Sequence, residues 1–135
     1  MKLLFLLSFF SLSALANVRH FVAFRYKASV TMAERKLIRK KFLDLQKLSL
    51  GKDGRKLVLA MESGLANSPE MADLGMHEAF LVTFNSTEDR NYYVGKPFFN
   101  EFEYHHDQFK SFVGPFLDLD NPKKPGVFVF DYAVK

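Results

Sequence analysis

The sequence predicts an α+β fold in which four antiparallel strands form one sheet and helices pack on one of its faces. Four segments are rich in β-branched and aromatic residues, which is typical of strands. Two stretches between them repeat apolar residues at helical spacing. The segments follow one another as β-α-β-β-α-β, and this order is the split β-α-β, or ferredoxin-like, pattern.

The first strand is predicted over residues 18–27, VRHFVAFRYK. Thr31 then begins a capping box, because Glu34 stands three residues later and can satisfy backbone N–H groups at a helix start. Apolar residues recur behind it at helical spacing, namely Leu37, Ile38, Phe42, Leu45 and Leu48. We therefore expect an amphipathic helix of about four turns after the first strand.

The middle of the chain predicts two strands and two connections. Residues 51–54, GKDG, are typical of a turn, and residues 56–63 are predicted to form the second strand. Residues 64–75 have no clear periodicity and are expected to form a loop. Residues 76–84, MHEAFLVTF, then predict the third strand.

The last third of the chain completes the pattern. Ser86 caps a helical stretch that ends near Gly95. A further helix is predicted over about residues 100–113, because three phenylalanines at spacings of seven and three share one face. Residues 125–134 alternate Val and Phe and predict the final strand.

Both faces of the predicted sheet require burial. On the first strand, Val22 and Phe24 share the side of His20, whereas Phe21 and Ala23 point the opposite way. One layer of helices covers only one face. A second sheet from a partner chain would cover the other, so the sequence predicts a homodimer.

The N-terminal end differs from the rest of the chain. Lys2 precedes an apolar run over residues 3–12, and residues 14–16 read ALA, a cleavage pattern of small residues. The run is shorter than the about 20 residues that span a bilayer, although an N-terminal anchor and a buried first helix remain alternatives. We therefore expect residues 1–16 to be a signal peptide and residues 17–135 to be one secreted domain without a stable membrane span.

Composition narrows the function classes. The chain has no cysteine, which excludes disulfides, thiol catalysis and thiolate metal sites. Its formal charge of +4 is too small to predict nucleic-acid binding. Nucleotide-binding glycine motifs and the common hydrolase motifs are missing, so no cofactor is expected. Three of the sixteen phenylalanines lie in the predicted signal peptide, and the other thirteen can fill a core or line an apolar cavity.

Five strings, in order, cover nearly all of residues 17–135: VRHFVAFRYK, NSPE, EAFLVTFNSTEDRNYY, HDQFKSFVGP and VFVFDY. Together they resemble the stress-responsive A/B barrel domain family, a group of dimeric α+β barrels. The resemblance implies a ferredoxin-like subunit, a homodimer, and a pocket between the sheet and the first helix. No single string is specific, so the resemblance rests on the ordered set.

The family includes a plant polyketide cyclase, and the resemblance implies candidate catalytic residues. His20 matches the cyclase's first-strand histidine, and Tyr93 matches its pocket tyrosine. Its general-base histidine falls on Phe99 when the alignment runs forward from Tyr93. It falls on His106 when the alignment runs backward from Gly114, and we prefer His106 because the string FKSFVGP is closer to the family pattern.

One family position departs from the pattern. A third-strand histidine of the family falls on Glu78, while His77 stands one step away and therefore on the opposite face of a strand. The cyclase set is thus incomplete in this chain. The residues expected to line a ligand cavity are Val22, Phe24, Ile38, Phe42, Glu78 and Phe80.

Two functions follow, from different classes. The first is a secreted homodimer whose apolar cavity binds a small hydrophobic or aromatic ligand. The second is a cofactor-independent, cyclase-like lyase with His106 as general base and Tyr93 as hydroxyl partner, because ring closure needs an imidazole to take a C–H proton and a phenol to stabilise an enolate. We favour the first because the family's histidines are only partly retained.

Three other features of the sequence bear on function. His105 and His106 are adjacent, and neighbouring helical side chains diverge by about 100°, so no metal site is predicted. The basic run over residues 35–41 is typical of a solvated helix face. Asn85 begins the sequence NST, an N-glycosylation sequon in a eukaryotic secreted protein.

Overall fold

The computed structural model describes residues 17–135, so the predicted signal peptide lies outside the described residues. The elements, in chain order, are β1 (Val18–Phe24), α1 (Met32–Leu48), β2 (Val58–Leu65), β3 (Glu78–Phe84), α2 (Thr87–Val94), α3 (Tyr104–Val113), the 3-10 helix η1 (Gly114–Phe116) and β4 (Val127–Ala133). Every strand and helix expected from the sequence is present. Within this range no helix combines the length and the apolarity needed to cross a membrane.

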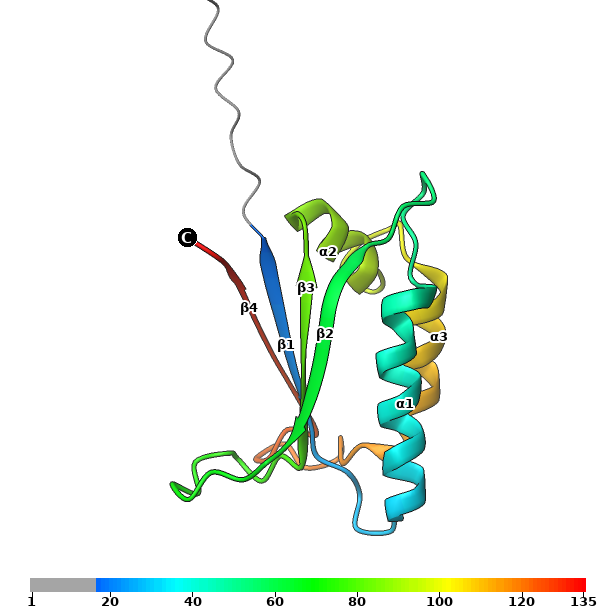
Figure 1. Ribbon diagram of the computed structural model, residues 1–135. Helices are drawn as coiled ribbons and strands as arrows, with labels where there is room; N and C mark the ends of the chain where they lie inside the picture. Colours follow the sequence, from blue (N-terminus) through cyan, green and yellow to red (C-terminus); the bar gives the residue numbers. More distant parts are fainter. Residues whose placement is uncertain (1–16) are drawn as a thin grey trace, which may run out of the picture.

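The four strands form one antiparallel sheet in the order β2-β3-β1-β4, which confirms the ferredoxin-like α+β fold. β1 lies in the centre, where Val22 pairs with Phe80 of β3 and His20 pairs with Asp131 of β4. All helices lie on one side of the sheet (Figure 1). Because side chains alternate along a strand, His20, Val22 and Phe24 all face the helices.

Capping and aromatic packing fix α1 on the sheet. The Thr31 hydroxyl accepts a hydrogen bond from the Glu34 N–H at 3.2 Å, and the Glu34 carboxylate accepts one from the Thr31 N–H at 2.7 Å, which is the predicted capping box. The ring of Phe42 stacks on Phe80 with centroids 4.0 Å apart. Ile38 is buried on the same face of α1. This part of the interior is therefore filled.

α3 begins at Tyr104, about one turn later than the predicted start near residue 100. The reason is a cap: the Glu103 carboxylate accepts hydrogen bonds from the N–H groups of His105 and His106, at 3.0 and 2.7 Å. Gly95 ends α2 with a positive φ of 57°, and a Cβ there would lie 2.4 Å from Phe102. The chain between α2 and α3 thus turns tightly, and the Glu103 N–H returns to donate to the Tyr92 oxygen at 2.9 Å.

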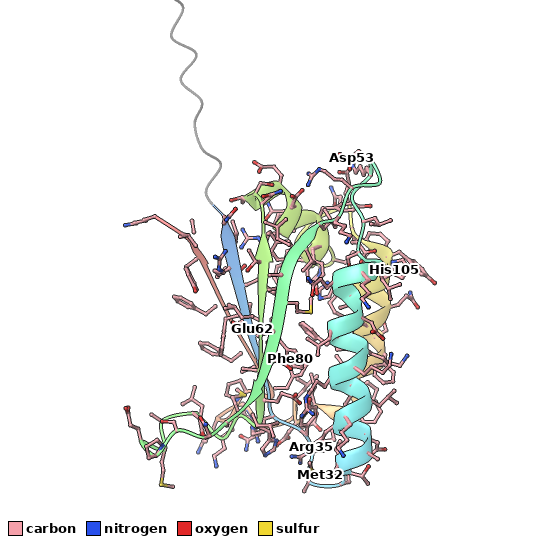
Figure 2. All side chains as sticks on the ribbon, viewed as in Figure 1. Met32, Arg35, Asp53, Glu62, Phe80 and His105 are labelled. Carbon is pink, nitrogen blue, oxygen red and sulfur yellow. The ribbon has the colours of Figure 1, made fainter. Side chains whose placement is uncertain are left out.

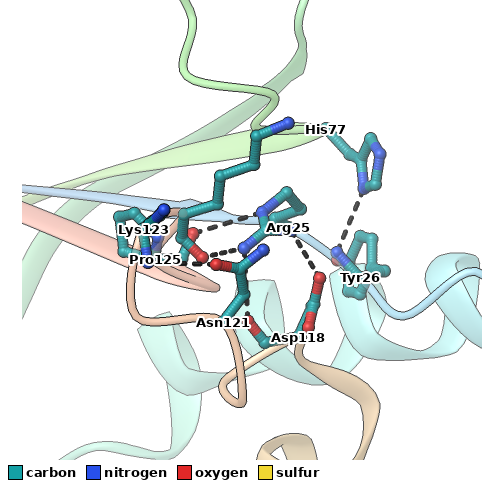
Figure 3. A network of polar contacts seen from close by, with 8 residues as sticks. Arg25, Tyr26, His77, Asp118, Asn121, Lys123 and Pro125 are labelled. Carbon is teal, nitrogen blue, oxygen red and sulfur yellow. Dashed lines mark hydrogen bonds and ion pairs between the residues drawn. The ribbon is translucent and has the colours of Figure 1, made fainter.

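Arg25, just after β1, holds the loop that leads into β4 (Figure 3). Its guanidinium pairs with Asp118 and donates to the carbonyl oxygen of Pro125 at 3.3 Å. The Arg25 backbone N–H also donates to the Gly126 oxygen at 2.9 Å. These contacts fix where β4 starts, and β4 carries Asp131.

The second face of the sheet is uncovered in the single chain. Phe128, Phe130 and Tyr132 of β4 point away from the helices and are 38%, 57% and 44% exposed. Phe21 of β1 lies beside Phe128 on this face, with ring centroids 6.2 Å apart. A row of aromatic side chains in water is costly, so this face is suited to contact with another surface.

Candidate functional site

A cavity of about 600 Å³ lies between the β1–β4 half of the sheet and α3. Its floor is formed by Val22 and Phe24 of β1 with Val127 and Val129 of β4. Residues of α3 and of the connection before it form the other wall, and Phe42 closes one side from α1. The cavity exists because α1 packs against β2, whereas β1 and β4 face the more distant α3.

The polar end of the cavity is built from β1, β4 and α2. Strand pairing sets His20 opposite Asp131, and His20 Nδ1 lies 2.7 Å from Asp131 Oδ1. Arg90 of α2 pairs with the second oxygen of the same carboxylate. Burial raises the pKa of Asp131, but the hydrogen bonds and charges of His20 and Arg90 outweigh burial and hold it below its usual value.

His106 lines the opposite wall. Its Nδ1 lies 2.6 Å from the carbonyl oxygen of Tyr93, so Nδ1 carries the donated proton and Nε2 keeps a lone pair. Burial, followed by the charges of Lys110 and His20, lowers the pKa of His106 to about 3, although the bond to Tyr93 acts in the opposite direction. His106 is therefore a neutral imidazole near pH 7.

Tyr93 lies beneath the cavity and does not line it. Its ring stacks on His106 with centroids 3.9 Å apart and lies 6.2 Å from the ring of His20. The hydroxyl has no hydrogen-bond partner among residues 17–135 and is fully buried. Burial, and then the charge of Glu103, raise the pKa of Tyr93 above its usual range. A buried hydroxyl without a protein partner is suited to a hydrogen bond with an ordered water.

The structure brings part of the predicted set together. Val22, Phe24, Phe42, His20 and His106 line the cavity, and so does Phe99, the alternative match for the family's histidine. The wall opposite the sheet is mainly α3, whereas the resemblance implied the first helix, which supplies only Phe42.

Three residues predicted to line the cavity lie elsewhere. Ile38 and Phe80 are fully buried in the packed core beneath α1. Figure 2 shows Phe80 on the sheet side of that helix. Glu78 does face the helices, but its carboxylate accepts from the Tyr26 hydroxyl at 3.0 Å and pairs with Arg39. These contacts hold it at the far end of β3, away from His20.

The sequence profile of the stress responsive A/B barrel domain matches residues 18–134. The chain belongs to this family. No curated protein matches the chain in sequence.

Three solved structures show the same fold as this A/B barrel domain. The hydroxynitrile lyase of Passiflora edulis is 20% identical with a TM-score of 0.66, and the match covers 89% of this chain and 94% of the lyase. An Arabidopsis thaliana protein, whose crystal structure was refined as an ensemble, is 23% identical with a TM-score of 0.68, covering 87% and 95%. A dimeric ferredoxin-like protein of unknown function from Jannaschia is 16% identical with a TM-score of 0.61, covering 87% and 99%.

The two adjacent histidines of this A/B barrel domain diverge. His105 is directed to Glu103, with Nδ1 2.9 Å from Oε1, whereas His106 faces the cavity. Across residues 17–135, no group of three histidine, aspartate or glutamate side chains converges as a metal site would require. Asn85 is exposed, while the Ser86 hydroxyl accepts from the Asp89 N–H as a helix cap.

Sequence reasoning missed Asp131, the partner of His20, and Arg90, which pairs with Asp131 in the A/B barrel domain. Asp131 follows Val127 and Val129 at alternating positions, so its direction toward the helices was readable from the period of the strand. Its pairing with His20 depends on strand register across 111 residues. Arg90 carries no local signal, because it reaches the site only through the placement of α2.

Proposed function

We propose that this A/B barrel domain binds a small hydrophobic or aromatic ligand that carries one polar group. The observation that supports this most is the composition of the 600 Å³ cavity, which has apolar side chains over most of its wall and one polar end at His20 and Asp131. Cavities of this size hold small organic molecules, and a few placed polar groups orient them. The apolar body would lie on Val22 and Phe24, with the polar group near His20.

Homodimerisation is part of the proposal. Structural relatives are described as dimeric, and the exposed aromatic residues of β4 form an apolar face without a cover in the single chain. An isologous contact through this face would bury Phe128 and Phe130 in both copies. The cavity lies on the other side of the sheet, so each subunit would keep its own.

Secretion is also proposed, on the leader pattern of residues 1–16 alone. In a eukaryotic host, the exposed Asn85 would then be a glycosylation acceptor. N-terminal sequencing of the mature protein tests the first point, with Asn17 as the expected first residue. A mature chain that begins at Met1 would contradict it.

A thermal-shift screen tests ligand binding. The probes are aromatic aldehydes and ketones, added to residues 17–135 of wild type and of His106→Ala. The proposal expects a concentration-dependent rise in the melting temperature of wild type and a smaller rise for the variant, because His106 forms part of the wall. Flat melting curves for every probe would contradict it.

A second candidate function is a cofactor-independent lyase or cyclase. It is favoured by two imidazoles on one cavity, one of them held by a carboxylate, and by the similarity in fold to a hydroxynitrile lyase. His106 stays in this proposal as general base, whereas the predicted hydroxyl partner Tyr93 is fully buried and does not line the cavity. The low pKa of His106 makes it a weak base. His20, which is held by Asp131, is better suited to accept a proton from a C–H acid.

Hydrogen–deuterium exchange separates the two candidates. A ketone found in the screen is incubated in D2O, and loss of the proton signal next to its carbonyl is followed by NMR. Lyase chemistry predicts exchange by wild type, slower exchange by His20→Asn, and unchanged exchange by His105→Asn, which alters an imidazole directed away from the cavity. Binding without exchange would support ligand binding and count against lyase chemistry.

A further inference from the structure

A second hollow lies beside the N-terminal half of α1. It measures about 230 Å³, and its lining comes from α1, the end of β2 and the start of β3. No residue lines both this hollow and the large cavity. Met32 and Arg35 mark its place at the end of α1 opposite the end next to His105 (Figure 2). The hollow is therefore a separate site, and nothing in the proposed function uses it.

Arg35 brings an unpaired positive charge to this hollow. Its guanidinium lies over the ring of Tyr26, 5.1 Å from the centroid. Among residues 17–135, no carboxylate lies within 4.0 Å of it, and its buried Nε has no hydrogen-bond acceptor. Arg39, one turn further along the helix, differs because Glu78 neutralises it. The hollow thus has one guanidinium in need of an anion.

His77 supplies a second donor. Its Nδ1 accepts a hydrogen bond from the Tyr26 backbone N–H at 3.0 Å (Figure 3), so the neutral ring carries its proton on Nε2. The ring lies nearly parallel to that of Tyr26, with centroids 6.0 Å apart. Burial, and then the charges of Arg35 and Arg25, lower the pKa of His77, while Asp73 acts in the opposite direction. The local field is therefore positive at this imidazole.

The remaining lining is apolar or already satisfied. Glu78 accepts from the Tyr26 hydroxyl and pairs with Arg39, so its charge is offset inside the wall. Met32, Leu65 and Met76 form the apolar part. A guanidinium fork with a flat apolar wall matches a carboxylate with an apolar substituent better than a fully hydrated anion such as phosphate.

We propose that this hollow binds a small organic carboxylate. The carboxylate pairs with Arg35 and accepts from the Nε2–H of His77, and its apolar substituent lies against Met32 and Met76.

NMR of the His77 ring tests the proposal on the full domain, with benzoate as the probe. Bound benzoate offsets the charge of Arg35, so the His77 signals shift saturably and the pKa of His77 rises. Arg35→Gln is expected to weaken benzoate at least about tenfold, because a charge-assisted hydrogen bond is lost. Lys36→Gln removes the same charge from the next position of α1 but does not line the hollow, so its affinity should match wild type.

The NMR signals of His77 report on this hollow, whereas those of His20 and His106 report on the large cavity. Binding at the two sites can therefore be followed separately. Arg35→Lys keeps the positive charge but removes the planar guanidinium, and we expect it to weaken benzoate several-fold. If Arg35→Gln does not give the NMR spectrum of a folded protein, Arg35→Lys alone tests the role of Arg35. The proposal is overturned if the His77 shift does not saturate or if the Arg35 variants bind like wild type. It is also overturned if inorganic phosphate binds as tightly as benzoate.

Discussion

His20 and Asp131 face each other across β1 and β4, with Nδ1 of the imidazole 2.7 Å from Oδ1 of the carboxylate. Arg90 forms an ion pair with the other oxygen of this carboxylate. The carboxylate therefore fixes the ring from the Nδ1 side, and Nε2 is the nitrogen left for a ligand. This pair makes one end of an otherwise apolar cavity polar, and the proposed ligand would place its polar group there.

Asp131→Asn is expected to lower the free energy of unfolding by about 1–2 kcal/mol near pH 7, because a neutral amide replaces the half-buried carboxylate that bonds to His20 and pairs with Arg90. The pKa of Asp131 is below its usual 3.8 in the folded chain. Its contribution is thus fully present above about pH 5 and is lost as the pH falls through the lowered pKa. Urea unfolding between pH 2 and pH 7 checks this, and the gap between wild type and variant should close at the acid end.

The exposed Asp120→Asn provides the control for that experiment. It should match wild type at every pH, since no cationic partner lies within bonding distance of Asp120 among the described residues. A constant gap between Asp131→Asn and wild type would mean that the carboxylate charge contributes nothing.

His106 should remain neutral from about pH 5 to pH 8, because burial lowers its pKa to about 3. The unfolded chain binds a proton at this histidine below about pH 6.5, so His106 reduces stability as the pH falls from there toward 3. Its ring signals, followed by NMR, should not move over the neutral range. An inflection near pH 6.5 would show that the ring is open to water.

Phe130→Glu is expected to separate the proposed homodimer into single chains, because it places a charge on the uncovered aromatic face. Sedimentation equilibrium of residues 17–135 should give the mass of two chains for wild type and of one chain for the variant. Tyr104→Glu alters an aromatic residue that is similarly exposed, but on α3, and should stay dimeric. A wild-type mass of one chain would refute the dimer.

Arg25→Met should destabilise the domain by about 3 kcal/mol, because it leaves Asp118 without its partner and frees the loop before β4. The lower end of the range for buried pairs applies, since Asp118 is 32% exposed. Denaturant unfolding measures the change, and Lys36→Gln at an exposed position of α1 is the control. A loss below about 0.5 kcal/mol would show that the loop does not depend on Arg25.

The fold was predictable because its signals are local. The alternation around Val22 and Phe24 defines the two faces of β1, and the capping box of Thr31 and Glu34 sets the start of α1. The order of strands and helices then leaves the ferredoxin-like sheet as the natural arrangement. The predicted helix start near residue 100 was wrong by about one turn. The Glu103 side chain caps the helix, so α3 begins at Tyr104 although the apolar spacing extends further back.

The site was less predictable because its geometry is not local. Phe80 has the same burial signal as Val22, yet it faces α1 in the filled part of the interior. Which half of the sheet stays hollow depends on where α3 lies, and that position depends on the turn between Gly95 and Glu103. Arg90 likewise reaches Asp131 only in the folded chain.

The most direct test of ligand binding is calorimetric titration of the best aromatic probe into wild type and Val22→Phe. Val22 lies on the cavity floor, so the larger ring would occupy the space of the ligand. Leu37→Phe makes the same kind of change on the exposed side of α1 and is the control. We predict saturable binding to wild type and Leu37→Phe and at least about a tenfold loss for folded Val22→Phe. Equal affinity for all three proteins would place the ligand elsewhere and contradict the account.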